Sequence, residues 1–321
     1  MIVIERIKKQ WFLTGIVLVF LLVILDKTAT LARAGIFLKN HNGSSVMIFF
    51  IFLFSGFIIE PDQIKAGIKD VKATAITLVV IVLAAPVAAY LLSFIPLETG
   101  VILGLFIVAA MPTTLSSGVV MTGQAGGNMA HALFVTILSN CVSIVSIPVI
   151  LPLLLLSLKL KTELFIDQKA IFIKLILLVL LPLVAGLFLK KTVLPITMAR
   201  KKQLGIINQL IIICVVYMSL SGARQILIAK SATFWEILPL VAGFHLILLG
   251  ICFGLSRFLD IGRGRREAIL FMGSQKTLAL SVMIQITCFP EYGTALLVCV
   301  MHHILHLMID GYLAARMGEK G

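Results

Sequence analysis

Long apolar runs separated by short polar segments dominate the chain from end to end. An α-helix needs about 20 predominantly apolar residues to cross the hydrocarbon core of a bilayer. Runs close to this length predict ten membrane-spanning helices. The expected spans are residues 11–25, 45–59, 73–95, 99–123, 128–157, 170–189, 204–225, 235–257, 267–288 and 290–314.

The ten expected spans divide into two sets of five at the loop around residues 161–168. The two halves are then residues 1–162 and 163–321. An odd number of crossings in each half means that the second half enters the membrane with the opposite orientation. The predicted fold class is therefore an all-α membrane protein built from two inverted five-helix repeats.

Spans four and nine are both interrupted by polar residues, glycine or proline. Span four contains Met-Pro-Thr-Thr-Leu-Ser-Ser-Gly at 111–118, and span nine contains Gly-Ser-Gln-Lys-Thr at 273–277. Pro112 removes a backbone donor, while Gly118 and Gly273 allow conformations that other residues avoid. Paired interruptions in corresponding spans of two halves point to a binding site at the membrane midplane. We therefore expect these helices to break and to cross there.

Lys276 lies inside span nine, where an ammonium is expensive to bury, by roughly 3 kcal/mol on insertion scales. Such a residue is usually retained for function, so we interpret Lys276 as the centre of a transport site. The alternative is a lysine nearer a membrane face that extends its side chain to the headgroups. The polar residues expected around this site are Thr113, Ser116, Ser117, Asn128, Thr136, Asn140, Ser274, Gln275, Thr277 and His303.

Span five supplies Thr136 and Asn140, and a glycine-rich turn places Asn128 near its start. Polar side chains in a membrane helix can form hydrogen bonds to neighbouring helices. They can also bond only to the carbonyls of their own helix. For Thr136 both interpretations stay open, whereas Asn140 favours the first.

Every Asp and Glu falls in a loop or near a span end, and Asp310 is the deepest. We therefore expect no carboxylate at the crossing to bind Na⁺ or relay protons. His302, His303 and His306 fall together in span ten, but no nearby Cys or carboxylate completes a metal site. The expectation is polar packing, without a metal or cofactor, and the same holds for His245.

Composition supports a membrane protein: 60% of the residues are hydrophobic, 13% are charged and the mean hydropathy is +1.13. With the N-terminus inside, 17 Lys and Arg fall in inner segments and nine in outer ones, so the net charge of +13 reflects topology and not a nucleic-acid partner. The protein is then expected in the cell membrane, with both termini on the cytoplasmic side. The first span is expected to be retained, and the five cysteines form no Cys-x-x-Cys pair.

The motifs at 112–128 and 273–280, with the His303 segment and the ten spans, resemble the bile acid:sodium symporter superfamily. The nearer likeness is to the sodium/bile-acid-symporter-like cation/proton antiporter group, which contains the seventh human bile-acid-carrier paralogue. The resemblance implies a core of spans three to five and eight to ten beside a panel of spans one, two, six and seven. It also implies two Na⁺ ions behind the crossing in sodium-coupled members.

By position, Ser117 and Thr136 match the ion ligands of those members. The other ligands do not match: a second hydroxyl falls on Ala132, an Asn on Gly118 or Val119, and a Glu on Leu270. The broken helices would still present carbonyls with partial negative charge, which a cation must neutralise. We interpret Lys276 as that cation in place of Na⁺.

The function predicted is secondary transport of a small organic anion by alternating access, independent of Na⁺. Coupling would be to protons through Lys276, or absent. Two alternatives stay open: a sodium-coupled symporter, and a regulatory membrane protein that keeps the transporter fold and is linked to ion homeostasis. An enzyme is not expected, since no His-Glu-x-x-His or Gly-x-Ser-x-Gly motif is present. The sequence specifies neither the substrate nor the oligomeric state.

Overall fold

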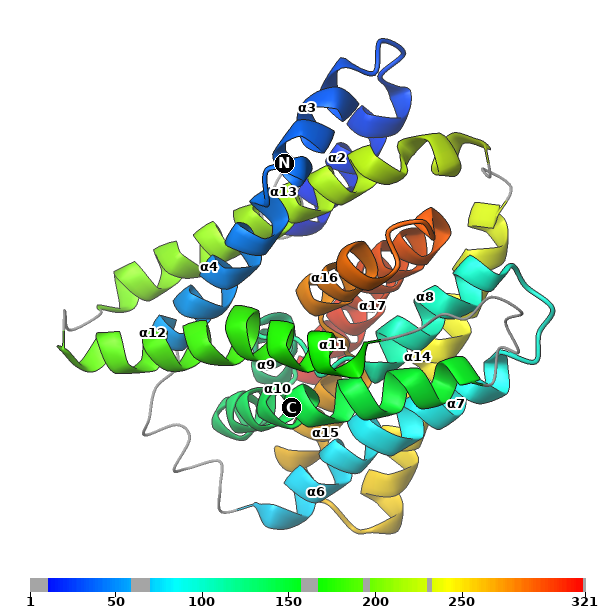
Figure 1. Cartoon of the computed structure of the whole chain (residues 1–321). Coiled ribbons are helices and arrows are strands. Elements are labelled where there is room, and N and C mark those ends of the chain that lie inside the picture. The colour runs from blue at the N-terminus through cyan, green and yellow to red at the C-terminus, as the bar shows by residue number, and fades with distance from the viewer. Residues whose placement is uncertain (1–10, 59–69, 157–166, 193–196, 230–232, 320–321) are drawn as a thin grey trace.

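The computed structural model describes residues 11–58, 70–156, 167–192, 197–229 and 233–319, and these ranges contain helices and no strands (Figure 1). The helices are α2 (Trp11–Leu25), α3 (Thr30–Asn40), α4 (Gly43–Ile58), α6 (Val71–Val79), α7 (Ala85–Leu92), α8 (Thr99–Ala110), α9 (Ser117–Gln124), α10 (Met129–Leu156), α11 (Gln168–Leu175), α12 (Leu181–Thr192), α13 (Met198–Ala229), α14 (Thr233–Phe258), α15 (Arg265–Ser274), α16 (Leu278–Cys288) and α17 (Gly293–Gly318). Two π-helical turns, η1 (Val80–Ala84) and η2 (Ile176–Leu180), join α6 to α7 and α11 to α12.

Within the described residues, seven helical segments are long and apolar enough to cross a membrane, or up to eight if the bent pair α2 and α3 counts as one. Helices α4 and α8 are shorter apolar helices. The chain is therefore a helical, multi-pass membrane protein, and ten crossings stay a prediction. The seven segments are Val71–Leu92, Met129–Leu156, Gln168–Lys190, Ala199–Ala229, Thr233–Phe258, Arg265–Cys288 and Gly293–Gly318.

Helix α3 is an element that the hydrophobic pattern did not predict, because it lies between the first two expected spans. It is bent by 112° from α2. The carboxylate of Asp26 accepts the backbone N–H groups of Thr28 at 3.0 Å and Leu31 at 2.8 Å, so it supports the turn that starts α3. Residue Arg224 of α13 donates to the carbonyl of Val23 at 2.8 Å and holds the end of α2.

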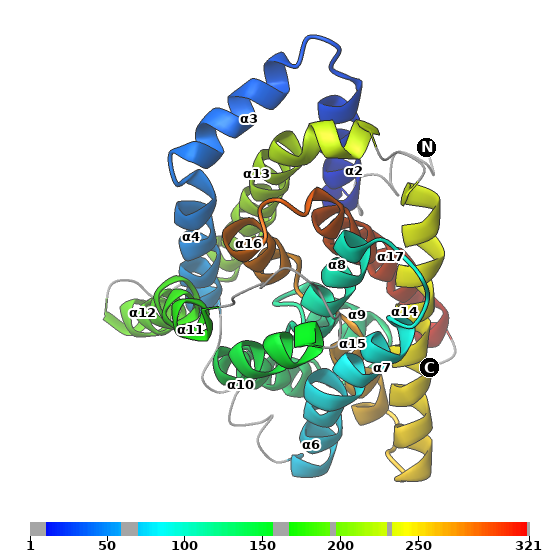
Figure 2. The same cartoon turned by 45° about the vertical axis from the view of Figure 1, so that its right-hand side comes forward.

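The helices form two groups, which Figures 1 and 2 both show. In one group α4 packs against α12 and α13, and α13 also packs against α2 and α3. In the other, α17 packs against α8 and α14, and α15 packs against α14 and α9. Gly56 and Gly186 let α4 and α12 approach closely: a Cβ at Gly56 would lie 2.3 Å from the Leu183 carbonyl oxygen.

Both π-helical turns precede a proline by two residues, Pro86 after η1 and Pro182 after η2. Proline has no N–H to donate to the preceding turn, and π turns are often found at functional sites. Pro86 therefore leaves carbonyl groups of η1 available to another donor.

Candidate transport site at the helix crossing

The two interrupted helices break where their polar residues begin. Helix α8 ends at Ala110 and α9 begins at Ser117, while α15 ends at Ser274 and α16 begins at Leu278. Met111 is extended, with φ −76° and ψ 151°, as expected for a residue that precedes proline. The two breaks touch, because the backbone N–H of Thr277 donates to the Pro112 carbonyl at 3.0 Å.

Lys276 is 1% exposed, and its ammonium donates to three backbone carbonyls. Its Nζ lies 3.1 Å from Ile81 O, 3.0 Å from Ala109 O and 2.9 Å from Met111 O. An ammonium has three N–H donors, so these bonds use all of them. Its burial excludes the alternative in which Lys276 extends to a membrane face.

The three acceptors of Lys276 are carbonyls that their own helices leave free. Ile81 lies in η1, five residues before Pro86, which has no N–H to donate to it. Ala109 and Met111 flank the C-terminal residue of α8. The C-terminal end of a helix carries partial negative charge. The ammonium of one broken helix therefore neutralises the open end of the other.

Gln275 connects the same two breaks through its side chain. Its Oε1 accepts the hydroxyls of Thr114 at 2.8 Å and Ser117 at 2.9 Å. Its Nε2 donates to Asp310 Oδ2 at 2.8 Å. The buried amide therefore links span four to α17.

Asp310 overturns the expectation that no carboxylate lies at the crossing. It is fully buried, and its Oδ1 lies 2.8 Å from His245 Nε2 of α14. The expected span ended at residue 314, but α17 continues to Gly318, and the turn that carries Asp310 packs against the crossing. Glu267 is also buried, but its carboxylate accepts the Gly264 N–H at the start of α15 and serves as a cap.

Gly118 and Gly273 are not the residues at which the helices break. Gly118 is the second residue of α9, and Gly273 lies inside α15. Both are needed for close packing: a Cβ at Gly118 would lie 2.7 Å from Met272 Sδ, and one at Gly273 would lie 2.6 Å from Cys252 Sγ. Pro112 is the expected breaking residue that does lie in an interruption.

Of the span-five residues, Thr136 reaches the crossing, since its hydroxyl donates to Thr114 O at 3.3 Å and to Ala132 O at 3.0 Å. The Asn140 amide donates to Thr136 O of its own helix at 2.8 Å. Asn128 lies apart from the crossing, where its N–H donates to Gly264 O at 2.7 Å and its side chain accepts the His131 N–H. The Asn128 side chain therefore caps the first turn of α10.

The remaining predicted residues differ in exposure. The hydroxyl of Thr113 is buried and has no partner within the described structure. Thr277 is buried in the break, and Ser274 donates to Leu270 O of its own helix at 2.7 Å. Ser116 is exposed at the start of α9.

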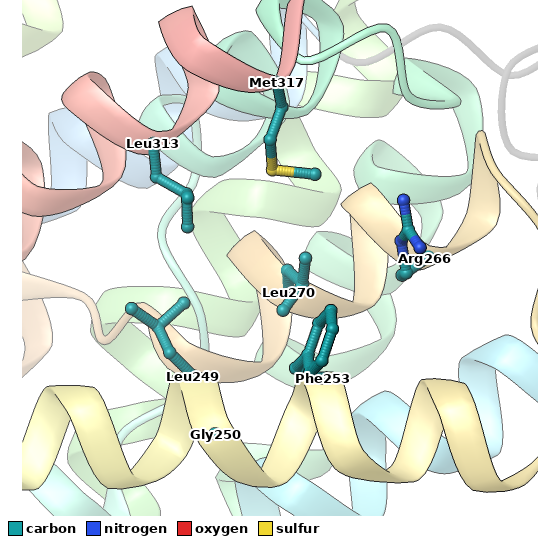
Figure 3. Close-up of a pocket in the computed structure, with 7 residues that line it drawn as sticks. All are labelled: Leu249, Gly250, Phe253, Arg266, Leu270, Leu313 and Met317. Atoms are coloured by element: carbon teal, nitrogen blue, oxygen red, sulfur yellow. The ribbon is translucent and has the colours of Figure 1, made fainter. Parts of the chain in front are cut away.

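Hydrocarbon occupies two positions that carry sodium ligands in the resemblance. Ala132 is fully buried in an apolar cluster with Ile81 and Met272. Leu270 borders a groove of about 420 Å³ between α14, α15 and α17, which Figure 3 shows. The groove is lined by Leu249, Gly250, Phe253, Arg266, Leu270, Leu313 and Met317, so it does not lie between the two helix groups.

His303 belongs to a histidine cluster beside the crossing. Its Nδ1 lies 2.9 Å from His306 Nε2, and its ring packs edge-on against Phe12 at 5.9 Å. The rings of His245 and His302 complete the cluster. Within the described residues, no group of three or more His, Cys, Asp or Glu is placed to hold a metal ion. Asp310 lies one turn beyond His306 on the same helix face, a spacing that could have revealed it from sequence.

Comparison with known proteins places these features in a family. The chain matches the SBF-like CPA transporter family over residues 10–319, and it belongs to that family. The resemblance to the bile acid:sodium symporter superfamily is thereby confirmed, and the family is one of transporters.

Two curated relatives illustrate the relationship. The chain is 31% identical over 286 residues to a "Probable sodium/metabolite cotransporter BASS4, chloroplastic" of Arabidopsis thaliana, a match that covers 84% of this chain and 65% of the plant protein. It is 26% identical over 310 residues to a "Sodium/bile acid cotransporter 7" of Xenopus tropicalis, covering 94% of this chain and 89% of that protein. The chain thus spans just under two thirds of the plant protein's length.

Proposed function

We propose that the protein is a secondary transporter that moves a small organic anion by alternating access without Na⁺, with Lys276 in place of the ion. The observation that carries this proposal is the set of three hydrogen bonds from Lys276 Nζ to Ile81 O, Ala109 O and Met111 O. A resident ammonium leaves the carbonyls of the crossing with little need for a bound cation.

The replaced ligands support the same conclusion. Na⁺ prefers several oxygen ligands, and a buried cation needs its charge balanced by partners. Ala132 and Leu270 offer only hydrocarbon at two of the positions concerned. By position, only the hydroxyls of Thr136 and Ser117 match the ligands, which leaves fewer oxygens than the ion prefers.

For alternating access, we propose that the two helix groups act as a panel and a core. The panel would contain α2, α4, α11, α12 and α13, and the core the remaining membrane helices. The halves 1–162 and 163–321 would be inverted repeats with ten crossings and cytoplasmic termini in the cell membrane. The contact between Thr277 N and Pro112 O supports this arrangement, because each lies in the fourth span of its half.

The test is uptake into proteoliposomes that contain the purified protein. A labelled bile acid and a labelled short-chain carboxylate serve as probes, since the relatives' names concern bile acids and metabolites. We expect uptake of at least one probe to be the same in Na⁺ as in choline, with protein-free liposomes as the control. Thermal unfolding of the purified protein should also be unaffected by Na⁺.

A second candidate is a sodium-coupled cotransporter, which the printed names of the relatives favour. Uptake that requires Na⁺, together with stabilisation by Na⁺, would support it and contradict our proposal. A regulatory protein with the transporter fold, linked to ion homeostasis, is the other alternative. It predicts an intact protein that transports neither probe under any gradient.

A further inference from the structure

A line of buried ionisable side chains starts at Asp310 and continues through four histidines. His245 contacts Asp310 at 2.8 Å, and its ring centre lies 5.7 Å from that of His306 and 5.9 Å from that of His302. His306 in turn contacts His303 at 2.9 Å. The most exposed of these side chains, His303, is 6% exposed. Along α17 the line extends from His302 to Asp310, about 12 Å at 1.5 Å per residue.

Each of the four imidazoles has a ring nitrogen that packing leaves unpaired. His245 Nδ1, His302 Nε2, His303 Nε2 and His306 Nδ1 are buried and have no partner within the described structure. A buried polar atom without a partner costs about 1 to 3 kcal/mol. Four such atoms side by side are unusual for a stable core and call for a functional explanation. Ionisable residues inside membrane segments typically mark ion pathways and proton relays.

We propose that the Asp310–His245 pair binds a coupling proton and that His306, His302 and His303 form the route by which the proton reaches it. This proposal rests on the proposed transport function, and it assigns coupling to this pair instead of Lys276. In the proposed cycle, one proton binds to the pair from one side of the membrane and leaves it to the other side. No other bond is made or broken.

Gln275 can report the protonation of Asp310 to the crossing. While Asp310 is ionised, it accepts from Gln275 Nε2, and Oε1 is free to accept from Thr114 and Ser117. A proton on Asp310 Oδ2 makes the carboxyl a donor, for which the amide oxygen of Gln275 is a suitable acceptor. In the proposed step Gln275 turns over and releases both hydroxyls of span four. Proton binding at α17 would therefore change the contacts of a broken helix.

His245 gives the pair a second place for the proton. With Nε2–H directed at Asp310, the unpaired Nδ1 can accept it, and an imidazolium beside a carboxylate results. The proton can therefore wait on His245 before Asp310 and Gln275 change partners.

The titratable groups that face this pair come from three elements. Helix α17 contributes His302, His303 and His306, α14 contributes Cys252, and the break between α15 and α16 contributes Lys276. Lys276 has all of its N–H groups engaged with carbonyls, so it serves as a fixed charge. Phe12 of α2 contacts His303, Met121 of α9 contacts Gln275, and neither titrates.

Infrared difference spectroscopy of the protein in lipid bilayers tests the assignment without any substrate. The sample is acidified from about pH 8 to about pH 5, the range in which histidine titrates. We expect the wild type to gain a carboxylic-acid carbonyl band that shifts in D₂O. Asp310→Asn should lose this band, and Asp310→Glu should restore it at a changed frequency. His245→Gln should keep the band and change its titration midpoint.

Glu267→Gln is the matched control, because Glu267 is nearly as buried and its carboxylate accepts from Gly264 and Arg266 instead of a histidine. It should retain the band. Identical difference spectra for wild type and Asp310→Asn would overturn the proposal. The proposal would also be overturned if the purified protein, after treatment with a chelator, still contained one metal ion per chain, because the histidines would then be metal ligands. If Asp310→Asn does not fold, an unchanged midpoint in His245→Gln overturns it equally.

The two proposals can fail independently. A requirement for Na⁺ in the uptake assay would contradict the proposed function and leave the carboxyl band of Asp310 in place. Conversely, loss of the proton assignment in the infrared experiment would leave Na⁺-independent uptake unaffected.

Discussion

The ammonium of Lys276 donates to the carbonyl oxygen of Met111 at 2.9 Å, so a side chain in one interrupted helix closes the open end of the other. The partners are separated by 165 residues in the chain. The last carbonyls of α8 have no donor within their own helix at the break. The ammonium of Lys276, from the second half of the chain, supplies that donor. The stability of the crossing therefore depends on a single positive charge.

Lys276→Met should destabilise the protein by about 3 kcal/mol or more, because three buried carbonyls lose their donor. Thermal unfolding in detergent, followed by intrinsic fluorescence, measures the effect. Lys72→Met is the control: Lys72 is exposed and donates to the Leu259 carbonyl at 2.7 Å, so its loss should change stability by about 0.5 kcal/mol or less. Equal stability of Lys276→Met and wild type would show that Lys276 is not the substitute cation.

Lys276→Glu should make the protein responsive to Na⁺. The substitution replaces the resident ammonium with a carboxylate among three carbonyls, and oxygen ligands of this kind attract a hard cation. We expect its unfolding temperature to rise with added NaCl and not with choline chloride, while that of the wild type does not respond. The interpretation would be contradicted if NaCl raised the unfolding temperature of the wild type more than that of Lys276→Glu.

Gly118→Ala should cost about 1 to 3 kcal/mol, as overpacking does in a close-packed core. The new Cβ would lie 2.7 Å from Met272 Sδ and 3.2 Å from Gln275 Oε1. Gly243→Ala in α14 is the control, because nothing lies within 4 Å of its Cβ position. There we expect a stabilisation of about 0.5 to 1 kcal/mol from the better helix propensity of alanine. Chemical unfolding of both variants measures the contrast, and equal effects would argue against close packing at Gly118.

Gln275→Glu should make stability depend on pH. The new carboxylate would face Asp310 at the 2.8 Å contact that the amide now makes, and two carboxylates so close cannot both ionise without strong repulsion. At low pH they share a proton, so the variant should be most stable there and should lose stability as pH rises. The double variant Gln275→Glu, Asp310→Asn should remove this dependence. A pH profile parallel to the wild type would contradict the contact.

The predicted topology can be checked by labelling cysteines placed at Glu98 and Glu319. Cys141 and Cys214 are exposed, so a cysteine-free background is needed. A membrane-impermeant maleimide added to whole cells should label residue 98, and residue 319 only after permeabilisation, because 17 basic residues fall on the inner side and nine on the outer. Labelling of both positions from outside would contradict the topology.

The sequence by itself determined the class of protein and the two polar stretches at which helices break, while the count of ten spans stays a prediction. These features depend on local properties: apolar length, a proline without a donor and a lysine among apolar neighbours. It also singled out Lys276, Ser117, Gln275 and Thr136 as polar residues in apolar segments. Their joint placement at the crossing matches that expectation in geometry, while their functional roles stay proposals.

Only the tertiary structure decided which partners these residues have. Ile81 O, 195 residues from Lys276, becomes an acceptor because η1 packs beside the crossing. Asp310 lies near the end of its span by sequence and is fully buried because His245 of α14 and Gln275 in the break after α15 contact it. Gly118 and Gly273 are required by neighbouring helices and not by the backbone. The burial of a side chain and its hydrogen-bond partners depend on segments far apart in the chain. The hydrophobic pattern reports only the local preference of each segment.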